Sequence, residues 1–199
     1  MSSFLTRFAL CLSLVVPVAC GGPSSPTAPL SSPASSPPSA PAGVAAPRIE
    51  VAFSPEAGSE ALVVKVIASA RQSIRLAGYS FTSPAVVKAL TDVKKRGVDV
   101  RVLIDDRGNR SAASQAAQRL IMGAGIPLRV ISVYAIHHDK YIVVDGATTE
   151  TGSFNYSQAA AKSNSENVLV VWNDRAVAAQ YLAHWDNRWA KGVEVEMAR

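Results

Sequence analysis

Four polar side chains in the second half of the chain have the types and spacing that phosphoryl transfer requires. His138 and Lys140 are two residues apart, as are Ser153 and Asn155. Side chains two apart on a strand share one face, so each pair presents its polar groups together. An imidazole titrates near neutrality and can attack phosphorus or move a proton. The other three groups can donate hydrogen bonds to phosphate oxygens. We therefore expect a site that cleaves phosphodiesters.

The residues between the two pairs predict a β-hairpin that brings them to one edge of a sheet. Residues 141–144 are β-branched or aromatic and run into Asp145-Gly146, a strong turn signal, and residues 148–151 form the returning strand. By the same alternation Asp145 falls on the opposite face from His138. We include Asp145 in the catalytic motif, and we expect it to fix the hairpin rather than to touch substrate.

This pattern resembles the HKD motif of the phospholipase D superfamily. It is complete at its defining positions, which are His138, Lys140, Asp145, Gly152, Ser153 and Asn155. The chain from about residue 53 to residue 189 is similar to the small bacterial endonucleases of that superfamily, which have one motif per chain. The resemblance implies phosphoryl transfer through a phosphohistidine, without a metal or other cofactor. In that scheme His138 is the nucleophile, and the phosphate is held by Lys140, Ser153 and Asn155.

The resemblance also implies that Glu166 orients His138. Glu166 lies at the start of a strand predicted over residues 167–172. If that strand lies beside the hairpin, the Glu166 carboxylate can accept a hydrogen bond from His138 Nδ1 and fix its tautomer. Spacing alone favours a capping or surface glutamate, and the family pattern favours the orienting role.

The chain contains one copy of the motif, which predicts a dimer. Transfer through a histidine needs one group to attack and another to protonate the leaving oxygen. Single-motif members of the family resemble half of the two-motif members and place their site on a two-fold axis. We therefore expect a homodimer with the active site at the two-fold interface, where two copies of His138 face one phosphate.

Asp105 and Asp106 form the strongest alternative site. Two carboxylates at the end of a central strand are typical of Mg²⁺ ligands. The residues that follow predict a polar turn instead, and neither a further acidic cluster nor a zinc-type spacing is present in the sequence. We expect no metal. His137 and His184 are interpreted as structural or solvated histidines.

Residues 48–199 have the length of one domain, in which short apolar strands alternate with amphipathic helices. The pattern predicts an α/β fold, with a mixed β-sheet sandwiched between helices, parallel in its first half and antiparallel at the hairpin. Strands are expected at 49–53, 74–81, 98–104, 126–131, 141–144, 148–151 and 167–172. Helices are expected at 55–73, 82–97, 111–122, 156–162 and 174–191. Trp185 and Trp189 are one turn apart and predict the buried face of the last helix.

The N-terminal segments predict export. Residues 1–19 have the short apolar run of a secretory signal peptide. Cys20 stands where a bacterial lipoprotein is lipidated, although Pro17 departs from that pattern, and ordinary cleavage after Ala19 is the alternative. Residues 20–47 are rich in Pro, Ser and Ala and without charge, which predicts a tether. We expect a periplasmic or cell-envelope protein, which an N-terminal lipid on Cys20 would tether to a membrane.

The substrate follows less directly from the sequence. A formal net charge of +5 is consistent with a polyanionic partner. We expect binding to the DNA or RNA backbone with little sequence preference, and hence a non-specific endonuclease. Two alternatives remain open: a phospholipase D that acts on lipid head groups, and a non-catalytic nucleic-acid-binding protein of the envelope.

Overall fold

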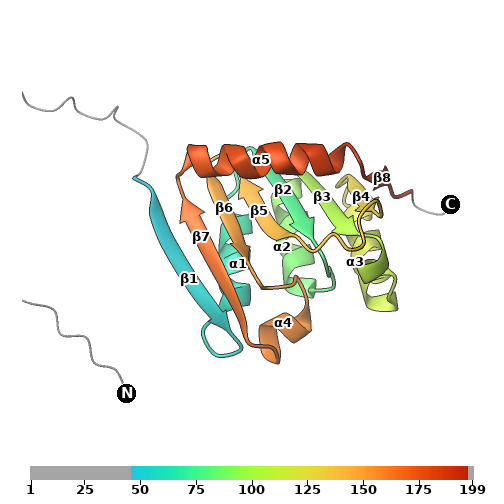
Figure 1. Ribbon diagram of the computed structural model, residues 1–199, viewed down its shortest axis with the longest axis horizontal. Helices are drawn as coiled ribbons and strands as arrows, with labels where there is room; N and C mark the ends of the chain where they lie inside the picture. The colour runs from blue at the N-terminus through green and yellow to red at the C-terminus, as the bar shows by residue number, and fades with distance from the viewer. Residues whose placement is uncertain (1–45, 197–199) are drawn as a thin grey trace, which may run out of the picture. The chain divides into compact units, whose positions relative to one another are not determined.

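The computed structural model describes residues 46–196, which form a mixed eight-stranded β-sheet with helices on both faces (Figure 1). The signal peptide, Cys20 and almost all of the tether lie outside the described residues. The strands lie in the order β1-β7-β6-β5-β2-β3-β4-β8. The predicted α/β fold is therefore confirmed.

The first half of the domain alternates strands with helices, as its sequence pattern predicts. Its elements are β1 (Arg48–Ser54), α1 (Ser59–Ala68), β2 (Ser73–Gly78), α2 (Pro84–Lys95), β3 (Asp99–Asp105), a 3-10 turn (Arg107–Asn109), α3 (Ala112–Gly123) and β4 (Leu128–Ile131). Pairing is parallel between β2 and β3 and between β3 and β4. Helix α2 begins where expected because Ser83 accepts a hydrogen bond from the Val86 amide and Pro84 occupies the first turn.

The second half is antiparallel and contains the motif hairpin. Its elements are β5 (Lys140–Val144), β6 (Thr148–Gly152), α4 (Gln158–Lys162), β7 (Glu166–Trp172), α5 (Arg175–Trp189) and β8 (Val193–Glu194). Strand β5 pairs with both β2 and β6, so the hairpin joins the two halves of the sheet. No helix within residues 46–196 is long and apolar enough to cross a membrane.

Two apolar clusters hold the helices against the sheet. Side chains of α1, α2, α3 and α4 pack on one face, whereas α5 packs on the other face and crosses the strands (Figure 1). Trp185 of α5 is 1% exposed, its Nε1 donates to Leu76 O, and its ring stacks on Trp189 at 4.7 Å. The predicted buried stripe on the last helix is therefore confirmed.

Helix α1 and strand β8 differ most from the prediction. Helix α1 is shorter than the predicted range 55–73. It begins only after Gly58, the N-cap residue, which has a left-handed conformation with φ of 76°. It ends before Ser73, which already belongs to β2. Strand β8 has only two residues, too few for a periodic signal, and it pairs with β4 through Arg129 and Val130.

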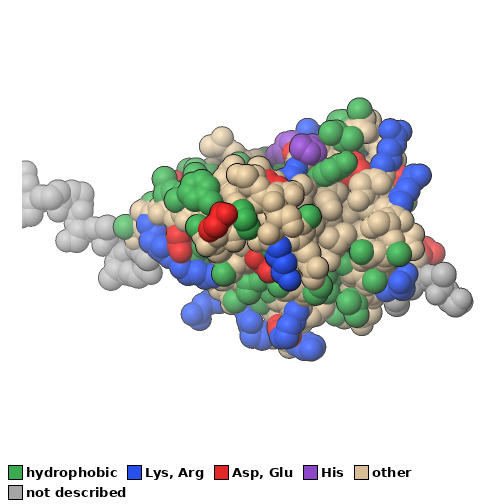
Figure 2. All heavy atoms as spheres, turned by 90° about the horizontal axis from the view of Figure 1, so that it is seen from below, with side chains coloured by type: hydrophobic (Ala, Val, Ile, Leu, Met, Phe, Trp, Pro, Cys, Tyr) green, Lys and Arg blue, Asp and Glu red, His purple; other side chains and the backbone are tan. Residues whose placement is uncertain are grey.

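Strand ends meet at one edge of the sheet and define where the site can form. Gly78, the last residue of β2, pairs with Lys140, the first residue of β5. Gly152, at the end of β6, pairs with Val168 near the start of β7. This edge lies at the bottom of Figure 1, and Figure 2 shows histidine side chains at the surface when the domain is seen from below.

Candidate active site

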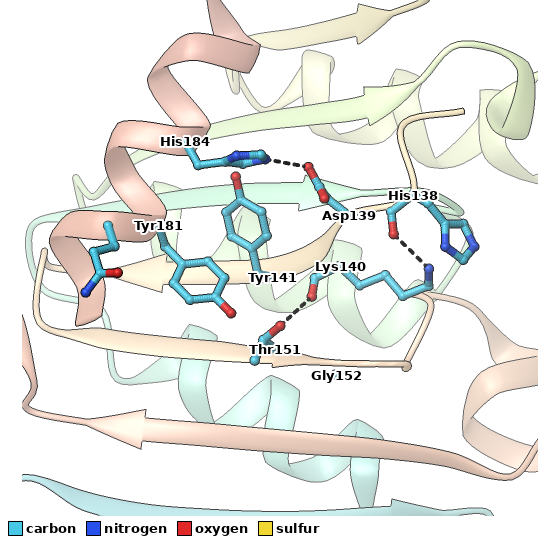
Figure 3. Close-up of a pocket in the computed structure, with 9 residues that line it drawn as sticks. His138, Asp139, Lys140, Tyr141, Thr151, Gly152, Tyr181 and His184 are labelled. Carbon is cyan, nitrogen blue, oxygen red and sulfur yellow. Dashed lines mark hydrogen bonds and ion pairs between the residues drawn. The ribbon is translucent and has the colours of Figure 1, made fainter. Parts of the chain in front are cut away.

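His138 and Lys140 lie side by side at this edge. His138 is exposed on the loop before β5, whereas Lys140 opens the strand and is only 7% exposed. Lys140 Nζ donates to the His138 carbonyl oxygen at 3.1 Å, and Figure 3 shows the lysine chain extended toward that residue. The ring of Tyr79 contacts both, with its centroid 4.8 Å from the His138 ring and 5.4 Å from Lys140 Nζ. A reactive imidazole and a cation thus lie next to each other at this edge of the sheet.

The lysine is suited to an anionic ligand. Burial lowers the pKa of Lys140, and the nearby carboxylates of Glu166 and Asp139 only partly oppose this shift. A phosphate bound at Nζ would supply the negative charge that favours the ammonium form. The geometry therefore fits Lys140 as a phosphate holder.

Ser153 and Glu166 meet each other at the same edge. Ser153 Oγ donates to Glu166 Oε2 at 2.6 Å and accepts from the Asn167 amide at 3.0 Å. The other carboxylate oxygen of Glu166 accepts from Asn164 Nδ2 at 2.9 Å. Among residues 46–196 no hydrogen bond joins Glu166 to His138, so the predicted orienting bond is not formed. Glu166 instead holds Ser153 and places negative charge near Lys140.

Asn155 follows Ser153 at the edge, and its Oδ1 is buried without a hydrogen-bond partner among the described residues. Asp145 lies at the far end of β5 from Lys140. Its carboxylate accepts three backbone amides, those of Arg71 at 2.9 Å and of Gln72 and Ser73 at 2.8 Å. Asp145 thus fixes the hairpin, as the strand alternation predicts.

A pocket of about 440 Å³ opens beside His138 between β5, β6 and α5 (Figure 3). It is lined by His138, Asp139, Lys140, Tyr141, Thr151, Gly152, Gln180, Tyr181 and His184. The pocket therefore gives a substrate access to the imidazole and to the strand that bears the lysine.

The family model "Cardiolipin synthase, PLD-like domain" matches residues 63–189, which include every motif position. The chain belongs to the phospholipase D superfamily. It is 35% identical over 145 residues to a phospholipase D of Rickettsia felis, covering 72% of this chain and 70% of the relative. It is 31% identical over 120 residues to a mitochondrial cardiolipin hydrolase of Xenopus tropicalis, covering 60% and 56%.

A solved structure agrees with this assignment. Nuc from Salmonella typhimurium, a phospholipase D family member, is 49% identical, with a TM-score of 0.75, covering 76% of this chain and all of Nuc. The protein is therefore a phosphodiesterase of the phospholipase D superfamily.

In this superfamily member, Asp105 has a structural role that the sequence did not indicate. Its side chain is 2% exposed. Oδ2 accepts from the His137 amide at 2.7 Å, and Oδ1 accepts from the Gly108 amide at 2.6 Å. Asp106 pairs with Arg110 at the surface. Within residues 46–196 no group of three His, Cys, Asp or Glu side chains is placed to hold a metal. Asp105 therefore anchors the loop that ends in His138.

A second histidine lies in the pocket, and no sequence pattern predicts its partner. His184 Nε2 lies 2.9 Å from Asp139 Oδ2. The same oxygen lies 3.3 Å from Nδ1 of His137, whose pKa is lowered by burial. His184 comes from α5 and Asp139 from the motif loop, 45 residues apart, so only the fold reveals the pair.

Proposed function

We propose that this protein is an exported endonuclease that cleaves the DNA or RNA backbone without a metal ion, through a phosphohistidine at His138. The observation on which this depends is the exposed His138 ring beside the buried Lys140. This arrangement presents a nucleophile next to a cation that an anionic diester would neutralise. The resemblance of the motif region to small single-motif endonucleases supports the same choice.

The chemistry proceeds in two balanced steps. A ring nitrogen of His138 attacks phosphorus, so that a P–N bond forms while the bond to the leaving oxygen breaks. The leaving oxygen takes a proton from a second imidazole. Water then attacks phosphorus and gives its proton to the second imidazole while the P–N bond breaks, which restores both imidazoles. Lys140, Ser153 and Asn155 hold the non-bridging oxygens throughout.

The second imidazole is the partner's copy of His138 in a homodimer. The loop before His138 has two exposed apolar side chains, Val133 at 62% and Ile136 at 51%. A second copy that brings its imidazole to the same phosphate must approach this loop, and it would bury both side chains. The interface and the active site would then form together.

The dimer is tested by measuring mass in solution. Val133→Asp with Ile136→Asp should give monomers with little activity, whereas Leu120→Asp, at an equally exposed position on α3, should remain a dimer. A fully active monomeric wild type would reject the shared site.

A nucleic acid is favoured as substrate by the formal net charge of +5 and by Arg188, which lines a second hollow together with His138. Lipid phosphodiesters are the second candidate, because the relatives include proteins named phospholipase D and cardiolipin hydrolase. Both substrates would use the same nucleophile and phosphate holders. They differ in what surrounds the phosphate.

One assay separates these candidates. Supercoiled DNA, RNA, phosphatidylcholine and cardiolipin are each offered with excess chelator to the wild type and to His138→Ala. Nicking that survives chelation and is lost in the variant supports the nuclease. Head-group release would identify a lipase instead. Nucleic-acid binding without cleavage would leave the non-catalytic envelope protein, and cleavage that needs magnesium would reject the phosphohistidine route.

Export and anchoring are part of the proposal. Cys20, at the end of the signal peptide, is proposed as the lipid attachment site. Labelled fatty acid should enter the wild type and not Cys20→Ser, and cell fractionation should find the wild type in the envelope. An unlabelled protein cleaved after Ala19 would instead be a periplasmic enzyme without an anchor.

A further inference from the structure

His138 lies between two hollows that are both bordered by α5. The pocket of about 440 Å³ lies on one side, and on the other is a hollow of about 150 Å³. The smaller hollow is lined by Tyr134, Ile136, His137, His138, Asp139 and Arg188. A chain-like ligand that passes over His138 from one hollow to the other would therefore run along α5.

One cation, Arg188, lines the smaller hollow, and a second, Lys191, contacts Tyr134 in its wall. The Arg188 guanidinium lies 4.8 Å from the centroid of the Tyr134 ring, and Lys191 Nζ lies 5.5 Å from it and donates to the Tyr134 hydroxyl at 2.9 Å. Neither side chain forms a salt bridge with a carboxylate within residues 46–196. Two free cations held on one aromatic ring beside the nucleophile are suited to phosphate groups.

The larger pocket has different chemistry. His184, one turn before Arg188, and Tyr181 present planar rings, and Gln180 adds an amide. Aromatic faces beside an amide are suited to a nucleobase.

We propose that α5 binds a single strand of nucleic acid across the active site. Arg188 and Lys191 would contact the backbone on one side of the scissile phosphate, and a base on the other side would stack in the pocket beside Tyr181 and His184. A duplex keeps its bases paired and stacked, so it could fill this pocket only by flipping one out. The inference rests on the proposed nuclease function and adds strand preference to it.

The cation contribution is tested by binding in a His138→Ala background, which prevents cleavage. Anisotropy of a labelled single-stranded oligonucleotide is measured over a range of salt concentrations. Arg188→Ala with Lys191→Ala should weaken binding by roughly tenfold and reduce the salt slope by about 1.4, or about 0.7 for each lost contact. Lys88→Ala with Lys95→Ala changes the net charge equally on α2, on the other face of the sheet, and should have little effect.

The base pocket is tested by strand preference. The wild type should cleave a single-stranded oligonucleotide faster than the duplex of the same sequence, and His184→Ala and Gln180→Ala should reduce this ratio by raising KM for the single strand. Gln115→Ala on α3 is the matched control. Equal cleavage of both strand forms, or a double variant at Arg188 and Lys191 that binds like its control, would overturn this inference while nuclease activity stands. A wild type that cleaves no nucleic acid would reject the proposed function and this inference together.

Discussion

The backbone amide of His137 donates to Asp105 Oδ2 at 2.7 Å, and this bond ties the loop of the nucleophile to the end of β3. The other carboxylate oxygen of Asp105 accepts from Gly108 at 2.6 Å. Both oxygens of a buried carboxylate are thus used to hold backbone rather than to bind a ligand. The position of His138 depends on a residue that belongs to no part of the motif.

Asp105→Ala should therefore lower kcat without removing any reacting group. The change leaves two backbone amides without their acceptor, which costs about 1 to 3 kcal/mol for a buried donor. A loop displaced by about 1 Å can reduce the rate about 100-fold. Steady-state cleavage and urea unfolding measure the two effects. Asp106→Ala removes only a surface ion pair and is the control; if both variants behave alike, Asp105 does not position the loop.

Gly152→Ala should disrupt the contacts that the end of β6 makes with β7. A Cβ at this position would lie 2.2 Å from the backbone oxygen of Asn167, and β7 cannot move away without displacing Glu166 and Ser153. We expect loss of most activity and a clear fall in the urea midpoint. Gly123→Ala is the matched control, because a Cβ there meets nothing within 4 Å and alanine favours a helix by about 0.5 to 1 kcal/mol. A Gly152→Ala enzyme with normal activity would contradict the close approach.

The fold could be predicted from the sequence because each element has a local signal. β-branched runs indicate the strands, and the Asp145-Gly146 turn indicates the hairpin. The two errors have local causes as well. Helix α1 starts late because Gly58 adopts a left-handed conformation, and β8 is too short to produce a pattern.

The site could be predicted only in part. His138 and Lys140 are neighbours in sequence, so strand alternation places them together. The contacts of Asp105 with His137, and of His184 with Asp139, join segments distant in sequence, and periodicity contains no information about such pairs. The same strand alternation predicts that Asp145 faces away from His138 and fixes the hairpin, and this prediction is confirmed.

Asp145→Ala should destabilise the protein more than it impairs the chemistry. The carboxylate accepts the amides of Arg71, Gln72 and Ser73, so its loss leaves three backbone amides at the start of β2 without their acceptor. Charged acceptors of this kind contribute about 1.5 to 3 kcal/mol. We expect a lower unfolding midpoint with kcat per folded molecule within a few-fold of the wild type. A variant as stable as the wild type but inactive would show instead that Asp145 takes part in the chemistry.

Glu150 is a buried carboxyl group on the returning strand of the motif hairpin. It is 1% exposed on β6, and its Oε2 accepts from the Tyr156 hydroxyl at 2.9 Å, while Oε1 has no partner among the described residues. Burial raises the pKa of Glu150 from 4.5 to about 8, although the Tyr156 bond opposes the shift. At neutral pH the folded protein therefore holds a proton that the unfolded chain releases.

The stability of the wild type should consequently fall as pH rises between 4.5 and about 8, because the unfolded state binds fewer protons than the folded state in this window. The free energy of unfolding should fall by at most about 1.4 kcal/mol for each pH unit. Glu150→Gln keeps an acceptor for Tyr156 and has no proton to lose, so its free energy of unfolding should not fall in this window. At pH 7 the variant should be more stable than the wild type by about 1 to 3 kcal/mol. Urea unfolding of both proteins at pH 5, 6, 7 and 8 measures the difference, with the exposed Glu56→Gln as control. If the two curves stay parallel across the series, Glu150 is ionised in the folded protein, and the buried carboxyl must then have a charge partner that its contacts do not show.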